Sequence, residues 1–213
     1  PLQVSGVASV AQTTGSITLS WSAPSASADN AASGYMVYHN DGVGGAEMST
    51  VGYDGSSSES TSGTISGLVG GREYSFVVSA LNRGGEGDVS DVLLQSTSPA
   101  APTALASTLQ TTTSITLSWA APVTESGGAD VTGYILYRND GSVSDAPSEV
   151  VYSGRHRSTV VNGLIGGHHY AFTVAALSAA GVGDASAALI TEDGGKGAYV
   201  DFHRVSTAPG VPD

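Results

Sequence analysis

Short stretches in which apolar and polar residues alternate recur along the whole chain. Ile17, Leu19 and Trp21 are separated by Thr and Ser residues, and the segment from Tyr74 to Ala80 alternates in the same way. Because successive side chains of a β-strand point to opposite faces, each stretch predicts a strand with one buried apolar face. Turn signals such as Asn40-Asp41-Gly42 separate the stretches. The pattern therefore predicts an all-β protein.

The alternating pattern occurs twice, because the chain contains an internal repeat. Ser16 to Pro24 reads SITLSWSAP and Ser114 to Pro122 reads SITLSWAAP, and the alignment extends back without a gap to Pro1 against Pro99. Further segments match in the same order: SGYMVYHNDG with TGYILYRNDG, and GLVGGREYSFVVSALN with GLIGGHHYAFTVAALS. About seven short strands in about 100 residues predict a two-sheet sandwich for each copy.

The boundaries of the copies follow from a repeated linker. Ser96-Thr97-Ser98-Pro99 recurs as Ser206-Thr207-Ala208-Pro209. We therefore expect one module over residues 1–98, a second over 99–208 with an insertion near 191–204, and over 209–213 the start of a linker to a further module. Proline restricts its own backbone and that of its predecessor, so the linkers predict a semi-rigid rod of modules.

Each copy also carries a set of aromatic and leucine residues at matched spacing. The set consists of Trp21, Tyr35, Leu68 and Tyr74 in the first copy and Trp119, Tyr134, Leu164 and Tyr170 in the second. With these residues the copies resemble fibronectin type III domains of an extracellular repeat protein. The resemblance implies two tandem immunoglobulin-like β-sandwiches, each with a tyrosine corner in which the phenol oxygen bonds to the backbone near the leucine. The chain contains no Arg-Gly-Asp, so the integrin binding of some relatives is not expected.

Composition narrows the classes of function. The chain has 7 Lys and Arg against 19 Asp and Glu, which gives a net charge of −12. Such a surface repels phosphate backbones and anionic lipid heads, so we expect neither nucleic-acid binding nor membrane-surface binding. No apolar run approaches the roughly eighteen residues of a membrane span, so we expect no membrane insertion of this segment either. Cysteine is absent, which excludes disulfides and thiolate metal sites.

Catalytic and metal-binding chemistry has little support in the sequence. The chain contains no Gly-x-Ser-x-Gly motif, and we predict no catalytic residue, no resident metal and no cofactor. One alternative stays open, an interdomain calcium ion held by loop carboxylates. Its candidate ligands are Asp130, Asp140, Asp184 and Asp193, which serve equally well as turn formers and surface charge.

The insertion in the second copy is the first candidate for a partner contact. It runs from Thr191 to Arg204 and mixes charge, glycine and aromatic rings. It is either a lengthened loop or a hairpin that touches the next module or a neighbouring chain. Its candidate contact residues are Glu192, Asp193, Tyr199, Phe202 and His203.

The second candidate is the outward face of the sheet that holds the third and sixth strands. If Tyr35, Val37 and Phe76 point inward, then Met36, Tyr38 and Val77 point outward, and so do Ile135, Tyr137, Thr173 and Ala175 in the second copy. A solvated face should be polar. This face either reflects the strand preference of aromatic and β-branched residues or forms a patch through which arrays associate side to side.

Three functions fit these features. The first is a non-catalytic structural module pair of a cell-surface fibre, appendage or matrix, whose partners are copies of itself, neighbouring modules, other matrix proteins or glycans. The second is an adhesion or receptor ectodomain that binds a protein or a glycan. The third is a spacer in a secreted carbohydrate-active enzyme. All three imply an extracellular or cell-surface location.

Overall fold

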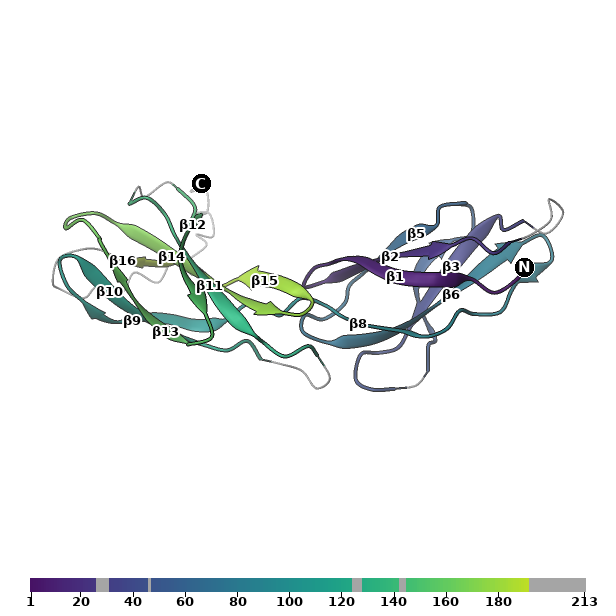
Figure 1. Ribbon diagram of the computed structural model, residues 1–213, viewed down its shortest axis with the longest axis horizontal. Coiled ribbons are helices and arrows are strands. Elements are labelled where there is room, and N and C mark those ends of the chain that lie inside the picture. Colours follow the sequence, from purple (N-terminus) through teal and green to yellow (C-terminus); the bar gives the residue numbers. More distant parts are fainter. Residues whose placement is uncertain (26–30, 46, 124–127, 142–144, 192–213) are drawn as a thin grey trace, which may run out of the picture.

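The structure, a computed structural model, describes residues 1–25, 31–45, 47–123, 128–141 and 145–191. All its regular elements are β-strands, which form two sandwiches that lie end to end in Figure 1. Within these residues no helix is long and apolar enough to cross a membrane. The predicted all-β fold of two tandem sandwiches is confirmed.

The first module is built from β1 to β8. A small sheet has the order β1-β2-β5, and a large sheet has the order β4-β3-β6-β7, with β8 also paired to β6. All pairs are antiparallel. The strands are β1 (Ser5–Gln12), β2 (Ser16–Ser22), β3 (Gly34–His39), β4 (Thr50–Gly55), β5 (Ser62–Ser66), β6 (Glu73–Asn82), β7 (Gly85–Glu86) and β8 (Leu93–Ser96).

The second module repeats this topology. Its small sheet has the order β13-β10-β9, and its large sheet has the order β12-β11-β14-β15, with β16 also paired to β14. Its strands are β9 (Thr103–Gln110), β10 (Ser114–Ala120), β11 (Gly133–Arg138), β12 (Glu149–Gly154), β13 (Ser158–Asn162), β14 (Tyr170–Ser178), β15 (Gly181–Ala185) and β16 (Leu189–Thr191).

The last strand of each sandwich is divided into two pieces. Between β7 and β8, the Ser90 amide donates to the Val78 carbonyl at 2.8 Å, and the Val78 amide donates to the Ser90 hydroxyl at 3.0 Å. Ser186 makes the same two bonds with Val174 in the second module, at 2.8 and 3.1 Å. A serine side chain thus replaces one main-chain partner, which is why eight strands are present where a sandwich of seven is expected.

Each module has its own apolar core between its two sheets. Alternate residues of β2 and β6 are fully buried in the first core, among them Ile17, Leu19 and Phe76, each 0% exposed. The second core places Ile115, Leu117 and Phe172 at the equivalent positions. Burying each such side chain contributes about 1.5–3 kcal/mol relative to leaving it exposed. The period-two alternation in the sequence therefore corresponds to the two faces of each sheet.

Candidate functional site

The aromatic and leucine residues that carry the family resemblance lie in the two cores. Trp21 and Tyr35 pack with their ring centroids 5.4 Å apart, and Trp119 and Tyr134 do so at 5.7 Å. Leu68 is buried, and Leu164 is partly buried against the second core.

Both tyrosine corners have the same geometry. The Tyr74 hydroxyl accepts a hydrogen bond from the Val69 amide at 2.9 Å, and the Tyr170 hydroxyl accepts one from the Ile165 amide at 3.0 Å. Each bond fixes the segment that crosses from the small sheet to the large one. These residues therefore stabilise the scaffold on which the surfaces below are displayed.

The linker between the modules is folded into a joint. Thr97 is 0% exposed and Ser98 is 1% exposed. The Thr97 hydroxyl donates to the Val69 carbonyl at 2.7 Å and accepts from the Arg72 amide at 3.1 Å. The Ser98 hydroxyl donates to the Ala180 carbonyl of the second module at 3.0 Å. Buried and bonded on both sides, the linker limits rotation of one module against the other.

Two glycines allow the modules to approach this closely. Gly71 has a positive φ of 73° and donates its amide to the Ser98 carbonyl at 2.9 Å. A Cβ on Gly183, in the β14–β15 hairpin region, would lie 2.0 Å from the Pro99 carbonyl oxygen. Any side chain at that position would push the second module away from the linker.

The outward face of the large sheet differs from expectation in the first module. Tyr38 and Met36 are partly exposed, but Val77, which lies opposite Tyr38, is only 5% exposed. The Glu86 carboxylate of β7 accepts a hydrogen bond from the Tyr38 hydroxyl at 2.9 Å and another from the Ser79 hydroxyl. Burial, followed by this hydrogen bond and the nearby negative charge, raises the pKa of Tyr38 above its ordinary value. A carboxylate therefore covers part of this face.

The same face of the second module carries no such charge. Val182 occupies the place of Glu86 and is 48% exposed. Ile135 and Tyr137 are partly exposed on the central strand, and Tyr137 pairs with Val150, which is 55% exposed. Ala175, expected to face outward, is 2% exposed because it lies between paired strands on both sides. This outward face is the more apolar of the two.

The candidate contacts of the insertion lie outside the described residues. These are Glu192, Asp193, Tyr199, Phe202 and His203. Thr191 closes β16, where its hydroxyl donates to the Tyr170 carbonyl at 3.2 Å. The first residue of the insertion is therefore paired within β16, and the rest of it lies outside the described residues.

The carboxylates proposed for calcium are spread over the second module. Asp130 precedes β11 and Asp184 lies in β15, at the end that faces the joint, whereas Asp140 follows β11 at the opposite end. All three side chains are exposed, and Asp193 is outside the described residues. In the part of the chain that is described, no three His, Cys, Asp or Glu side chains gather as a metal site.

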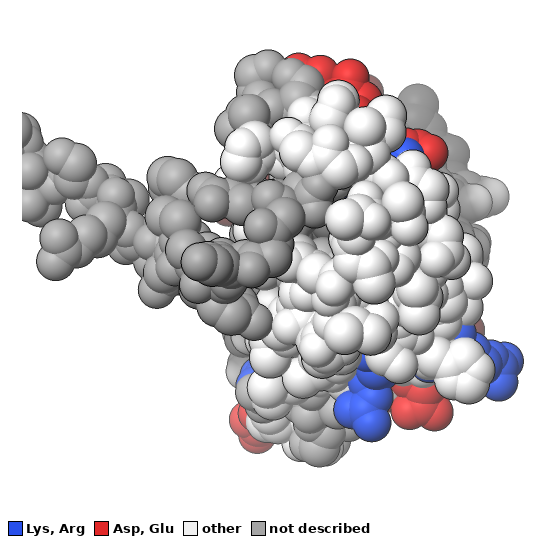
Figure 2. All heavy atoms as spheres, turned by 90° about the vertical axis from the view of Figure 1, so that its left-hand side faces the viewer, with Lys and Arg blue, Asp and Glu red and all other residues white. Residues whose placement is uncertain are grey.

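Charged residues are sparse on the free end of the second module. Figure 2 shows mainly uncharged surface there, with the basic and acidic side chains at its margins. Ile165, next to the second tyrosine corner, is 59% exposed at this end.

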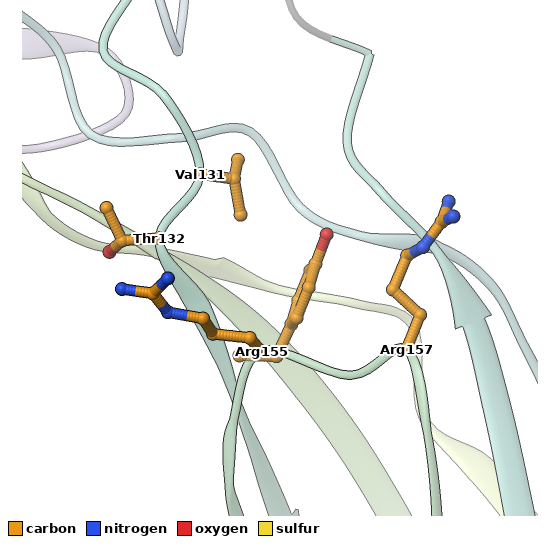
Figure 3. A pocket seen from close by; sticks show the side chains of 5 residues that line it. Val131, Thr132, Arg155 and Arg157 are labelled. Atoms are coloured by element: carbon orange, nitrogen blue, oxygen red, sulfur yellow. The ribbon is translucent and has the colours of Figure 1, made fainter.

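One pocket of the second module was not predicted from the sequence. Arg155 and Arg157 stand on opposite sides of it in Figure 3, and Val131, Thr132 and Tyr134 complete its lining. The signal that could have found it is the run Arg155-His156-Arg157, a basic turn in an acidic chain. Glu86 was missed as well, because its strand has only two residues, too few to show a pattern.

Comparison with known proteins identifies the modules. A family model described as "Fibronectin type III domain" matches residues 2–95 and 100–192. Chitinase A1 from Niallia circulans is 36% identical over 180 residues, which cover 79% of this chain and 22% of that protein. Neogenin from Homo sapiens is 34% identical over 182 residues, which cover 83% of this chain and 12% of that protein. The chain thus spans less than a quarter of either relative.

Solved structures with the same type of module are similar at low identity. The crystal structure of chicken CNTN1 FN1-FN3 domains covers 90% of this chain and 67% of that chain, at 21% identity and a TM-score of 0.49. A segment of two fibronectin type III domains from chicken tenascin covers 89% of this chain and 98% of that chain, at 19% identity and a TM-score of 0.43.

Proposed function

Because the chain belongs to the fibronectin type III family, we propose that it is a non-catalytic structural module pair of an extracellular repeat array. In this role it forms or decorates a cell-surface fibre, appendage or matrix, and it does so by self-association. The partners are other copies of the chain and neighbouring modules. The described residues form a scaffold with exposed surfaces, and in this proposal the function depends on contacts between the surfaces of different copies.

The observation that carries this proposal is the joint. A floppy linker would be exposed and unbonded, whereas Thr97, Ser98 and Pro99 are buried between the modules. A fixed joint holds successive modules at a constant orientation and distance, so that their surfaces repeat at constant spacing along the array. Regular spacing is what allows many weak contacts to act together as a firm attachment.

The outward face of the second large sheet is the surface we assign to self-association. Its exposed side chains are apolar or uncharged, and the neighbouring β16 adds Ile190, which is 40% exposed. Contiguous apolar surface on a soluble module is typical of an interaction site. A second copy suits this surface because two apolar faces of the same chain lose water together, and neither needs a charged partner.

Assembly can be tested on concentrated protein by electron microscopy and sedimentation velocity. We expect filaments or sheets with an axial repeat set by one or two modules. The double variant Tyr38→Ser and Tyr137→Ser should lose this assembly while its thermal unfolding changes little. The control is Val160→Ser, which removes an exposed apolar side chain from the small sheet of the second module. Assembly that persists in the double variant would contradict the proposal.

A second candidate function is a spacer within a secreted carbohydrate-active enzyme. It is favoured by the 36% identity to chitinase A1, which this chain matches over only 22% of that protein's length. In that case the wild-type chain stays monomeric when concentrated, and the flanking sequence encodes a catalytic domain. The similarity to neogenin supports an adhesion or receptor role in the same limited way. Dispersed rods with a saturable protein ligand would favour that role.

A further inference from the structure

The pocket between Arg155 and Arg157 has the features of a binding site for an anion. It has a volume of about 240 Å³ and lies where β11 begins and where β12 turns into β13. Thr132 contributes a hydroxyl and Val131 an apolar wall. An enclosed apolar cavity of about 150 Å³ holds a benzene ring, so the volume of this open pocket is large enough for one six-membered ring.

In the part of the chain that the structure describes, no carboxylate forms an ion pair with either arginine. Arg138, by contrast, forms an ion pair with Glu149 at 2.6 Å. Within the described residues neither Arg155 nor Arg157 has an acidic partner. In a chain with a net charge of −12, two guanidinium groups that line one pocket and pair with no described carboxylate create a local positive field. Guanidinium groups bind carboxylates with charge-assisted and often bidentate hydrogen bonds.

A tyrosine hydroxyl in the pocket lining suits the same chemistry. Tyr134 lines the pocket, and although the residue as a whole is only 5% exposed, its hydroxyl is not among the buried unpaired polar atoms of the described residues. A tyrosine hydroxyl at the wall of a pocket can donate a hydrogen bond to an acceptor on a ligand. Tyr134 comes from the core of the module, which makes its position well defined.

In the first module a negative charge acts on the equivalent tyrosine. Tyr35 corresponds to Tyr134, and its pKa is raised by burial and then by the negative charge of Glu59. Glu59 belongs to the turn between β4 and β5, which contains six residues, Ser56 to Thr61. The corresponding turn of the second module contains only Arg155, His156 and Arg157. The shorter turn lacks the carboxylate and places guanidinium groups beside the tyrosine instead.

We propose that this pocket binds a carboxylated sugar, a uronic acid residue within an acidic polysaccharide. The carboxylate of the sugar pairs with an arginine, while the ring hydroxyls meet Thr132 and Tyr134. The two arginines stand on opposite sides of the pocket, so a chain with more than one carboxylate fits better than a single small anion. The residues that line this site are different from Tyr137 and Val182, so separate variants test it and the self-association proposed above.

Binding is measured by isothermal titration calorimetry of the full chain with trigalacturonic acid. The fully methyl-esterified trisaccharide serves as the uncharged control ligand. We expect saturable binding of the acid and none of the ester. The double variant Arg155→Ser and Arg157→Thr introduces the residues of the first module, and it should weaken binding about tenfold or more because it removes the charge-assisted bonds.

Two further variants test whether binding depends on the residues of the pocket or on the positive charge of any exposed arginine. Arg83→Ser removes an exposed arginine of the first module and should leave the affinity unchanged. Tyr134→Phe keeps the core packing and removes one hydroxyl, so it should weaken binding a few-fold without unfolding the module.

Several outcomes would overturn the proposal. One is the absence of saturable binding to the wild-type chain. Another is equal affinity in the double arginine variant while its circular dichroism stays native. Dextran sulfate binding as tightly as the uronate, with equal loss in Arg83→Ser, would show charge attraction alone. If the arginine variant instead loses dimers in sedimentation experiments and the trisaccharide has no effect, the ligand is an acidic segment of a second copy, and the sugar assignment is wrong.

Discussion

The two modules have the same interior and different exteriors. Their cores use the same aromatic residues, from Trp21 and Trp119 to Phe76 and Phe172, and differ only in aliphatic residues such as Val37 and Leu136. Their surfaces diverge at single positions, where Glu86 in one module corresponds to Val182 in the other. The comparison teaches that the alternating pattern determines the sandwich, while a few exposed side chains determine what each sandwich contacts.

The largest expected effect concerns the independence of the two cores. Trp119→Ala should destabilise the second module by about 3–5 kcal/mol, because it leaves a cavity beneath Tyr134 and Tyr152. Urea unfolding followed by circular dichroism should then show two transitions, with that of the first module nearly unchanged. Trp21→Ala should reverse their order. A single shifted transition in either variant would mean that the modules unfold as one unit.

A smaller effect is expected where the modules meet. Gly183→Val should cost about 1–3 kcal/mol, because its side chain would overlap the Pro99 carbonyl. Small-angle X-ray scattering should detect a wider distribution of interdomain distances. Ala179→Val, on an exposed position of the same hairpin, is the matched control and should leave the scattering unchanged. Identical scattering from both variants would show that the joint does not constrain the modules.

The tyrosine corners should respond equally in both modules. Tyr74→Phe and Tyr170→Phe each remove one hydrogen bond to a backbone amide, so each should cost about 1 kcal/mol. Thermal unfolding of the two variants measures the difference. A much larger loss for Tyr74→Phe would show that its corner also supports the adjacent joint at Thr97.

The smallest effect on stability is expected when one outward-facing residue of the first module is replaced by its counterpart in the second. Glu86→Val should lower the pKa of Tyr38 toward its ordinary value, since one bond and one charge that favour the neutral phenol are lost. In the wild type this raised pKa contributes stability that is complete below the unfolded pKa of about 10 and is lost as the pH rises further. Ultraviolet titration of the tyrosines measures the change. An unchanged titration would contradict the bond between Tyr38 and Glu86.

Much of the fold was predictable because it depends on local patterns. Ile17, Leu19 and Trp21 alternate with polar residues, and a strand must bury them on one face. The division of the last strand was not predicted, since it depends on a tertiary bond from Ser90 to Val78. The burial of Val77 was missed for a similar reason, because its neighbours on adjacent strands cover it.

The candidate site was less predictable than the fold. The outward positions of Tyr38 and Tyr137 follow from alternation alone. The pocket between Arg155 and Arg157 depends on the length of a turn and on a tyrosine from another strand. Those residues are far apart in the sequence and come together only in the folded module, so local sequence patterns do not predict the pocket.

The position of the terminal strands determines how a module responds to tension along the array. β1 belongs to the small sheet and pairs with β2, whereas β8 belongs to the large sheet and pairs with β6. Strands β1, β2, β6 and β8 run roughly along the long axis of the molecule (Figure 1). A pull on the two ends therefore loads the hydrogen bonds of both terminal strands in shear, so that they resist together and do not open one after another. The same arrangement that joins modules end to end thus allows each to transmit force without first unfolding.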